Sequence, residues 1–307
     1  MRHSQRIDYF IVKKCVNSCI FCSEKNKLDD SEIPFIEVQK VLLEEKKKGA
    51  QLVHFVGGEP TLHTNFYEIL KYGKSLGYSI FIITNGIKFS EEAFAKKILP
   101  FLDEIMVSIH GHNEKIHTLC TNNPASFQCL VKGLENIKKY FKGRLEATTC
   151  VNKYNYCYLK EIAKLIHKFG IQEYQIMSIV PTGAGGENYY EINPRFEQIK
   201  PFIFKTIQFC EKEKIKIRFS GFPMCVLGPK YYIYSYDLWE NFTIPKTTLK
   251  SEPIELWKEP GKNLKFKIKL GRIKTSKCKK CKLNDVCGGI YEKYFIKYGD
   301  KELTPFL

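Results

Sequence analysis

Short apolar runs alternate with amphipathic stretches of helical length over most of this 307-residue chain, from about residue 6 to residue 219. Such a strand–helix repeat is typical of a parallel sheet covered by helices. The dense apolar character of the runs suits strands that are buried on both faces. Strands are expected at residues 7–12, 51–56, 78–84, 104–110, 144–151 and 173–180, with a possible seventh at 214–220.

Between these runs, apolar residues recur at the i, i+3, i+4, i+7 spacing of one helix face. Helices are expected at residues 35–49, 66–77, 91–102, 126–141, 156–170 and 194–214. Six such units predict an α/β fold, a partial (β/α)6 barrel of the TIM type. Because parallel sheets carry their chemistry at the carboxyl ends of the strands, we look for motifs there.

The repeat ends near residue 220, where a segment rich in Pro, Gly and aromatic residues begins without helical periodicity. We expect a boundary there, between a barrel at residues 1–220 and a smaller C-terminal unit at residues 221–307. Within that unit, the segment LKFKIKL from Leu264 and the segment RIKT after Gly271 predict a β-hairpin. A second group of cysteines and a short helix follow it.

The placement of the twelve cysteines indicates what they do. The N-terminus lacks an apolar stretch followed by a cleavage site, and no apolar run is long enough to span a bilayer. We therefore expect a cytoplasmic protein whose clustered cysteines bind metal or act in catalysis rather than form disulfides. The scattered cysteines are expected to be inert buried thiols: Cys120, Cys129, Cys150, Cys157 and Cys210.

The formal net charge is +16, from 49 Lys and Arg against 33 Asp and Glu. A positive charge of this size suits an acidic peptide or a nucleic acid as partner. The lysines are spread through nearly every expected helix, which favours a general richness in lysine over a dedicated nucleic-acid surface. Charge alone does not name the substrate.

Three cysteines, Cys15, Cys19 and Cys22, lie within eight residues on a loop just after the first expected strand. Three thiolates can hold three corners of a four-iron cube and leave one iron open, whereas an electron-transfer cluster would use four thiolates. The alternative for such a loop is a zinc knuckle.

The C-x3-C-x2-C spacing, with Phe21 just before the last cysteine, resembles the signature of the radical S-adenosylmethionine (SAM) superfamily. That resemblance implies a [4Fe–4S] cluster on the three cysteines, SAM bound at the open iron, and cleavage of SAM to a 5′-deoxyadenosyl radical. Further matches follow in the family's order. Gly57-Gly58-Glu59-Pro60, after the second strand, resembles the motif that holds the amino group of SAM.

The later strand ends carry further resemblances. Thr84-Asn85-Gly86 is similar to another part of the methionine site, and Ser108 resembles the residue that reaches the ribose. Thr149 and Ile179 stand where relatives line the ribose and adenine, although strand packing explains both equally well. The implied cofactor-binding residues are Phe21, Gly57, Gly58, Glu59, Pro60, Asn85, Ser108, Thr149 and Ile179. His110, His112 and His117 are expected in a loop and a helix cap.

A second group of cysteines, Cys278, Cys281 and Cys287, lies near the C-terminus, and Cys225 adds a fourth candidate. The group resembles the reduced SPASM, or twitch, extension of radical SAM enzymes, which implies one auxiliary [4Fe–4S] cluster. A full SPASM domain has seven cysteines for two clusters. The alternative is a four-cysteine zinc site. If only three cysteines bind the cluster, Cys225 is instead a candidate hydrogen-atom donor.

These resemblances imply a radical SAM enzyme acting on a ribosomally made peptide, with oxidation, crosslinking or epimerisation as the outcome. They also imply an electron donor such as flavodoxin or ferredoxin, and neither a membrane nor a nucleic acid is expected as partner. One alternative is a radical step on a small molecule in cofactor biosynthesis. An alternative of another class is a nucleic-acid-binding protein whose cysteines hold structural zinc.

Overall fold

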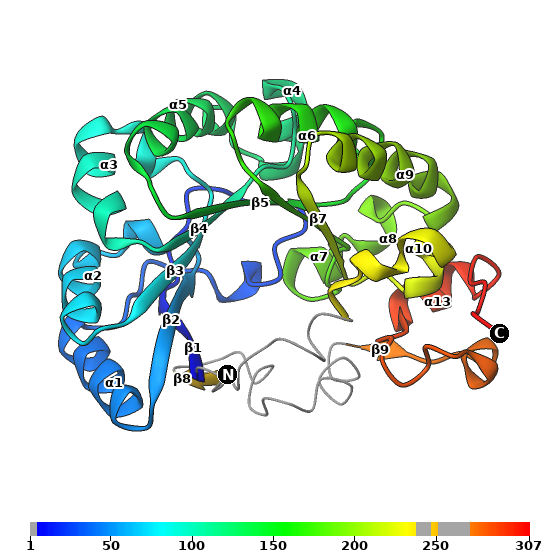
Figure 1. Ribbon diagram of the computed structural model, residues 1–307, viewed down its shortest axis with the longest axis horizontal. Coiled ribbons are helices and arrows are strands. Elements are labelled where there is room, and N and C mark those ends of the chain that lie inside the picture. The colour runs from blue at the N-terminus through cyan, green and yellow to red at the C-terminus, as the bar shows by residue number, and fades with distance from the viewer. Residues whose placement is uncertain (1–4, 238–246, 251–270) are drawn as a thin grey trace.

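The computed structural model of the chain describes residues 5–237, 247–250 and 271–307. Its main sheet has eight parallel strands in the order β7-β6-β5-β4-β3-β2-β1-β8. Because each crossover from β1 to β7 advances by one strand in the same direction, the sheet curves into a partial barrel (Figure 1). The strands are β1 (Gln5–Val12), β2 (Ala50–Gly57), β3 (Ser79–Thr84), β4 (Glu104–Ser108), β5 (Arg144–Cys150), β6 (Glu173–Met177), β7 (Lys216–Ser220) and β8 (Thr247–Lys250).

Helices form an arc over the outer face of this sheet (Figure 1). Their apolar residues merge with those of the strands into one core, as the helical spacing of apolar residues requires. The six expected helices correspond to α1 (Phe35–Lys47), α2 (Phe66–Ser75), α3 (Glu92–Ile98), α5 (Ser126–Tyr140), α6 (Leu159–Lys168) and α9 (Phe196–Lys212). The predicted α/β partial barrel is confirmed, and the possible seventh strand is β7.

Several elements were not predicted from the sequence. The added helices are α4 (Glu114–Thr121), α7 (Gly183–Glu187), α8 (Tyr189–Ile192) and α10 (Met224–Tyr231). The segment that begins near residue 220 lacks helical periodicity in the sequence but contains α10, which joins two short turns across a kink at Gly228, where φ is 75°. Such a break hides any helical periodicity. Strand β8 escaped prediction because its partner, β1, lies at the other end of the chain.

The two faces of the sheet differ, which corrects the expectation that both are apolar. Residues that point outward pack under the helices, whereas alternate residues carry charge into the barrel interior. Asp8 pairs there with His54 of the next strand at 2.8 Å and with Arg6. A second interior group joins Arg144 and Arg218 to two buried carboxylates, Glu146 and Glu173. The barrel interior is therefore held by ion pairs.

The C-terminal part contains a two-stranded antiparallel sheet, formed by β9 (Arg272–Ile273) and β10 (Ile290–Tyr291), followed by α13 (Glu292–Tyr298). A small antiparallel pair and a short helix are thus present, although the described partner of β9 is β10 rather than the segment from Leu264. The strand predicted from Leu264 to residue 270 lies outside the described residues. Among the described residues, no helix combines the length and apolar character that crossing a bilayer demands.

Helix α13 is anchored on the start of α9. The ring of Tyr294 stacks on Phe196 with centroids 4.0 Å apart. Its hydroxyl donates to Glu302, which also accepts from the Arg195 side chain and the Glu197 backbone amide. The Glu302 carboxylate therefore joins the chain's last turn to the barrel.

We expect Glu302→Ala to lower the free energy of unfolding by about 2 kcal/mol, because the buried Tyr294 hydroxyl loses its charged acceptor. Burial opposes ionisation of Glu302, but hydrogen bonds from Tyr294 and Arg195 outweigh it and lower the pKa of Glu302. This stabilisation is therefore full above the ordinary pKa of glutamate, and is lost as the pH falls through the lower folded-state pKa. Urea unfolding of wild type and variant between pH 7 and pH 3 measures the difference in their free energies of unfolding.

The matched control is Glu197→Ala, which removes an exposed carboxylate from the same cluster. We expect a change within about 0.5 kcal/mol for this variant. Equal stabilities of the two variants at pH 7 would contradict the anchoring role of Glu302.

Candidate functional site

The loop after β1 carries Cys15, Cys19 and Cys22, and all three thiols are partly buried. Burial raises the pKa of Cys15 to about 11, and the nearby Glu59 and Cys22 add to the rise. Burial, then negative charge on Cys22 and Cys15, also raises the pKa of Cys19. The three sulfurs are thus near enough for the charge of one to raise the pKa of another.

Neighbouring elements hold this cysteine loop, residues 15–22, from two sides. The Ser18 amide donates to Thr121 and the Ile20 amide donates to Cys120, both at the end of α4. From the other side, the Asn188 side chain donates to the Ile20 carbonyl at 2.9 Å. The loop is therefore positioned by backbone hydrogen bonds that need no metal.

The loop after β2 meets the cysteine loop through backbone contacts. The Gly58 amide donates to Val12 and the Glu59 amide donates to Lys14, each at 2.8 Å. A Cβ atom on Gly58 would lie 2.4 Å from the carbonyl oxygens of Lys13 and Lys14, and one on Gly57 would lie 2.3 Å from that of Val12. Because no side chain fits there, glycine is required for packing the two loops together.

Glu59 connects this loop to the loop after β3. The carboxylate is 2% exposed. It accepts from Thr61, from the Thr84 hydroxyl at 2.7 Å and from the Asn85 amide at 2.7 Å. Burial raises the pKa of Glu59, against the effect of the hydrogen bonds from Asn85 and Thr61. Each of these hydrogen-bond donors belongs to the chain itself, so Glu59 orients the loops in addition to any contact with a cofactor.

Asn85 supplies a polar group for a bound cofactor. Its side-chain oxygen accepts from the Ile87 amide, while its Nδ2 is buried with no hydrogen-bond partner at ordinary distance among the described residues. The amide lies near enough to Cys15 to oppose, in part, the rise in that thiol's pKa that burial causes. A buried donor without an acceptor is costly, so this position fits an acceptor such as a thiolate, a sulfide or a carboxylate.

Phe21 packs edge-on against His110, which follows β4, with ring centroids 4.7 Å apart. His110 in turn stacks on His117, which lies inside α4 rather than in a cap. Burial lowers the pKa of His110 to about 3 and that of His117 to about 4. Both imidazoles are therefore neutral at physiological pH, and they form a wall beside the cysteine loop.

The structure separates the other cofactor candidates. Ser108, the last residue of β4, pairs with Thr148, whose hydroxyl is buried without a partner among the described residues. Because alternate strand residues face opposite sides, Thr149 points away from Ser108. The Thr149 hydroxyl donates to Ile109 and accepts from Tyr174, and Ile179 is wholly buried in the core. Thr149 thus faces the opposite side of the sheet from Ser108, whereas Ile179 lies beside Gly185, which packs on the cysteine loop; the cofactor-binding roles of both residues stay predictions.

The sequence analysis missed the glycines of α7. A Cβ on Gly183 would lie 2.5 Å from the Ser23 carbonyl oxygen, and one on Gly185 would lie 2.8 Å from that of Phe21. The segment PTGAGGE therefore packs directly on the cysteine loop. Its position after the sixth strand, together with three glycines in four residues, was the signal available in the sequence.

Two cysteines expected to be inert lie beside the cysteine loop. Cys120 is fully buried, and its sulfur contacts Asn152. Burial, with added negative charge on Cys120, Cys19 and Cys22, raises the pKa of Cys150 well above its usual value. Cys150 therefore lies within electrostatic reach of two of the candidate cluster ligands, while its thiol stays protonated.

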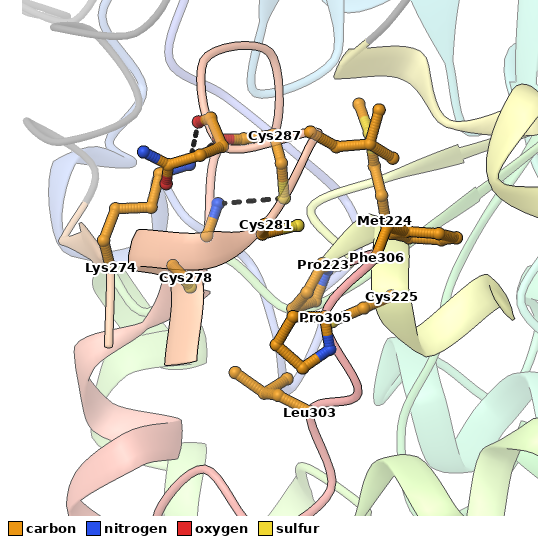
Figure 2. Close-up of a pocket in the computed structure, with 13 residues that line it drawn as sticks. Pro223, Met224, Cys225, Lys274, Cys278, Cys281, Cys287, Leu303, Pro305 and Phe306 are labelled. Atoms are coloured by element: carbon orange, nitrogen blue, oxygen red, sulfur yellow. Dashed lines mark hydrogen bonds between the residues drawn. The ribbon is translucent and has the colours of Figure 1, made fainter. Parts of the chain in front are cut away.

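The C-terminal cysteines line a pocket (Figure 2). Cys278 lies in a 3₁₀ turn, Ser276–Lys280, and Cys281 caps the end of that turn. Cys287 precedes β10, and Cys225 lies in α10. Burial, then the charge of Cys287 and the other two cysteines, raises the pKa of Cys225 to about 11. We call this site, Cys225 with Cys278, Cys281 and Cys287, the four-cysteine pocket. Among the described residues, no three His, Cys, Asp or Glu side chains are placed to share a single metal ion.

Fold and site define a class: a partial α/β barrel with a three-cysteine loop and a glycine–glutamate loop at the carboxyl edge of its strands. The family model described as the Radical SAM superfamily matches residues 9–166, which is more than half of the chain. The chain belongs to the radical SAM superfamily.

Curated relatives match over part of their length. Mycofactocin maturase MftC of Mycolicibacterium smegmatis is 25% identical over 185 residues, which is 60% of this chain and 47% of that protein. The AdoMet-dependent heme synthase of Methanosarcina barkeri is 26% identical over 215 residues, covering 68% of this chain and 59% of the synthase. The chain thus spans about half to three-fifths of these relatives.

Solved structures share the fold over nearly the whole chain. SuiB of Streptococcus suis bound to S-adenosylmethionine has a TM-score of 0.66 at 14% identity, covering 99% of this chain and 76% of SuiB. The protein anSMEcpe with bound AdoMet and the Cp18Cys peptide has a TM-score of 0.65 at 15% identity, covering 98% and 93% of the two chains.

We expect Gly58→Ala to abolish iron binding by the cysteine loop and to lower protein stability, because its methyl group would displace the Lys13 and Lys14 carbonyl groups. Gly73→Ala is the control, since its methyl group meets only the end of the Ile80 side chain, at 3.1 Å. Iron content after anaerobic reconstitution and thermal unfolding measure both. Normal iron binding by Gly58→Ala would show that the two loops need no close contact.

Proposed function

We propose that the chain is a radical SAM enzyme that modifies a peptide, with one cluster on the cysteine loop and a second in the four-cysteine pocket. One observation carries the first part: three thiols, the Glu59 network and the unpaired Asn85 donor meet at one edge of the barrel. When bound, a [4Fe–4S] cluster and SAM supply a carbon radical that takes a hydrogen atom from an unreactive C–H bond.

In this proposal, the chain's own residues bind the cluster and line the cofactor site. Cys15, Cys19 and Cys22 hold three irons, and the Asn85 amide donates to an acceptor beside them. Phe21, braced by His110, provides an apolar surface for a nucleoside. Gly57, Gly58 and Pro60 fix the position of Glu59, and Ser108 with Thr148 offers hydroxyl groups at the next strand ends.

We also propose that residues 221–307 form a twitch-like unit with an auxiliary [4Fe–4S] cluster. The convergence of four cysteines from two separate segments supports this assignment. Cys225 then acts as a ligand rather than as a hydrogen donor, since its thiol belongs to the pocket that the other three cysteines line. The zinc alternative predicts the same four ligands, and metal analysis distinguishes them.

Several features support a peptide as the substrate. The similar structures include SuiB bound to the precursor peptide SuiA and anSMEcpe bound to a peptide, and MftC is named a maturase. The net charge of +16 suits an acidic peptide and an acidic electron donor such as flavodoxin or ferredoxin in the cytoplasm. A small molecule is the second candidate, because the relatives also include a heme synthase and a probable GTP 3′,8-cyclase.

We expect anaerobically reconstituted protein to bind about eight irons, and the Cys15, Cys19 and Cys22 triple alanine variant to bind about four. That variant should form no 5′-deoxyadenosine from SAM. An alanine variant of Cys129, which is remote in sequence from both cysteine groups, is the control. A colourless protein that contains zinc, or a triple variant that still cleaves SAM, would contradict the proposal.

We expect a peptide to raise 5′-deoxyadenosine formation above the rate without substrate and to change in mass in the same reaction. The probes are synthetic peptides from short reading frames beside this gene, compared with GTP as the small-molecule probe. Mass spectrometry measures both the modified peptide and the 5′-deoxyadenosine. Stimulation by GTP, with none by the peptides, would favour the small-molecule candidate.

A further inference from the structure

The four-cysteine pocket also contains a lysine. Lys274 follows β9, lines the pocket, and donates its ammonium group to the backbone oxygens of Asn284 and Cys287 (Figure 2). Its side chain is half-buried, and it forms no ion pair with a carboxylate among the described residues. Lys274 thus brings a positive charge to a pocket whose other ionisable lining groups are thiols.

Arg272, two residues earlier, is a useful contrast. Its guanidinium contacts both carboxylate oxygens of Asp237, at 3.2 and 3.1 Å, and donates to Gly289. Asp237 in turn accepts from the Gly288 amide at 2.8 Å. The pair is buried and its charges offset each other, so it fixes the segment after Cys287 without adding net charge. The uncompensated charge at this pocket is that of Lys274.

Cys287 is the ligand candidate that receives these contacts. It is the most buried of the four cysteines, at 9% exposure, and its sulfur accepts from the Gly289 amide at 3.4 Å. Lys274 binds the carbonyl of the same residue. A half-buried cation is stabilised further by a nearby negative charge, and four thiolates around iron would supply it. Reduction by one electron adds a further negative charge, which such a cation favours.

We propose that Lys274 raises the reduction potential of the auxiliary centre, so that this centre accepts an electron from the substrate. The inference rests on the proposed function and selects oxidation or crosslinking over epimerisation. Hydrogen bonds and nearby charge are the main means by which a protein sets the potential of an iron–sulfur centre.

Oxidation of the substrate removes two electrons and two protons from it. A substrate C–H bond first loses a hydrogen atom to the SAM-derived radical. The substrate radical then gives one electron to the oxidised auxiliary cluster and one proton to water or a base. The substrate is thereby oxidised by two electrons, and a new bond or a double bond takes the place of the lost hydrogens. An electron-carrier protein then reoxidises the auxiliary cluster.

The test is a redox titration of the full chain, followed by visible absorbance and electron paramagnetic resonance. The same titration on the Cys15, Cys19 and Cys22 triple alanine protein assigns the auxiliary signal. The variants are Lys274→Met, which removes charge and hydrogen bonds, Lys274→Gln, which keeps a donor without charge, and Lys274→Arg, which keeps both. Lys279→Met removes an exposed lysine of the neighbouring 3₁₀ turn as the matched control.

At the wild-type midpoint potential, we expect about a tenfold smaller ratio of reduced to oxidised auxiliary centre in Lys274→Met and Lys274→Gln. For a one-electron couple this is a fall of about 59 mV. Lys274→Arg should stay close to wild type, and Lys279→Met should change little because water screens its charge.

Equal potentials in Lys274→Gln and wild type, at equal iron content, would overturn the inference and leave Lys274 a purely structural tie. An equal fall in Lys274→Gln and Lys274→Arg would also overturn it, because hydrogen-bond geometry rather than charge would then set the potential. Zinc in place of iron in the triple alanine protein would instead defeat the proposed auxiliary cluster itself. The two failures are therefore distinguishable.

Discussion

The contact between the backbones that extend β1 and β2 determines the arrangement of the site. Carbonyl groups of Val12 and Lys14 accept from the amides of Gly58 and Glu59, and the absence of side chains at residues 57 and 58 permits this approach. The cysteine loop leaves the first strand at this point, and the Glu59 carboxylate leaves the second. Because Glu59 also binds the Asn85 amide, three consecutive strand ends are held in one fixed arrangement.

The sheet supports this arrangement by separating its two faces. The outer face is apolar and packs under the helices, whereas the interior carries polar pairs, such as the hydrogen-bonded Asp8 and His54 and the ion pair of Arg218 with Glu146. Burial and the nearby Arg6 lower the pKa of His54 to about 4, so this pair contains a neutral imidazole. Pairing lowers the cost of burying polar groups in the interior, and it also fixes the register of neighbouring strands.

The periodicity of apolar residues predicted the strands and helices of the barrel, because these elements depend on neighbouring residues in the sequence. The apolar runs predicted the seven barrel strands, and the family resemblance pointed to Cys15, Glu59 and Asn85 at their carboxyl ends as candidate site residues. The side of the sheet that a strand residue faces depends on the register of the strand. The local sequence therefore did not show whether Thr148 or Thr149 shares the face of Ser108. The pairing of β8 with β1 depends on contacts between distant segments, as does the convergence of Cys225 with the C-terminal cysteines. The sequence suggested that convergence only through a family resemblance.

The two cysteine sites differ in the charges around them, and this difference would make their electrostatic preference for a reduced centre unequal. At the cysteine loop the neighbouring charges are of both signs, with Glu59 near Cys15, and Glu24 and Lys25 near Cys22. At the four-cysteine pocket the ion pair of Arg272 is neutral overall, and Lys274 adds a positive charge. If the proposed clusters occupy both sites, these charges would stabilise a reduced, more negative centre more strongly at the second site than at the first. In the proposed enzyme with a cluster at each site, an electron released by a substrate radical would therefore be drawn toward the C-terminal pocket, away from the cysteine loop.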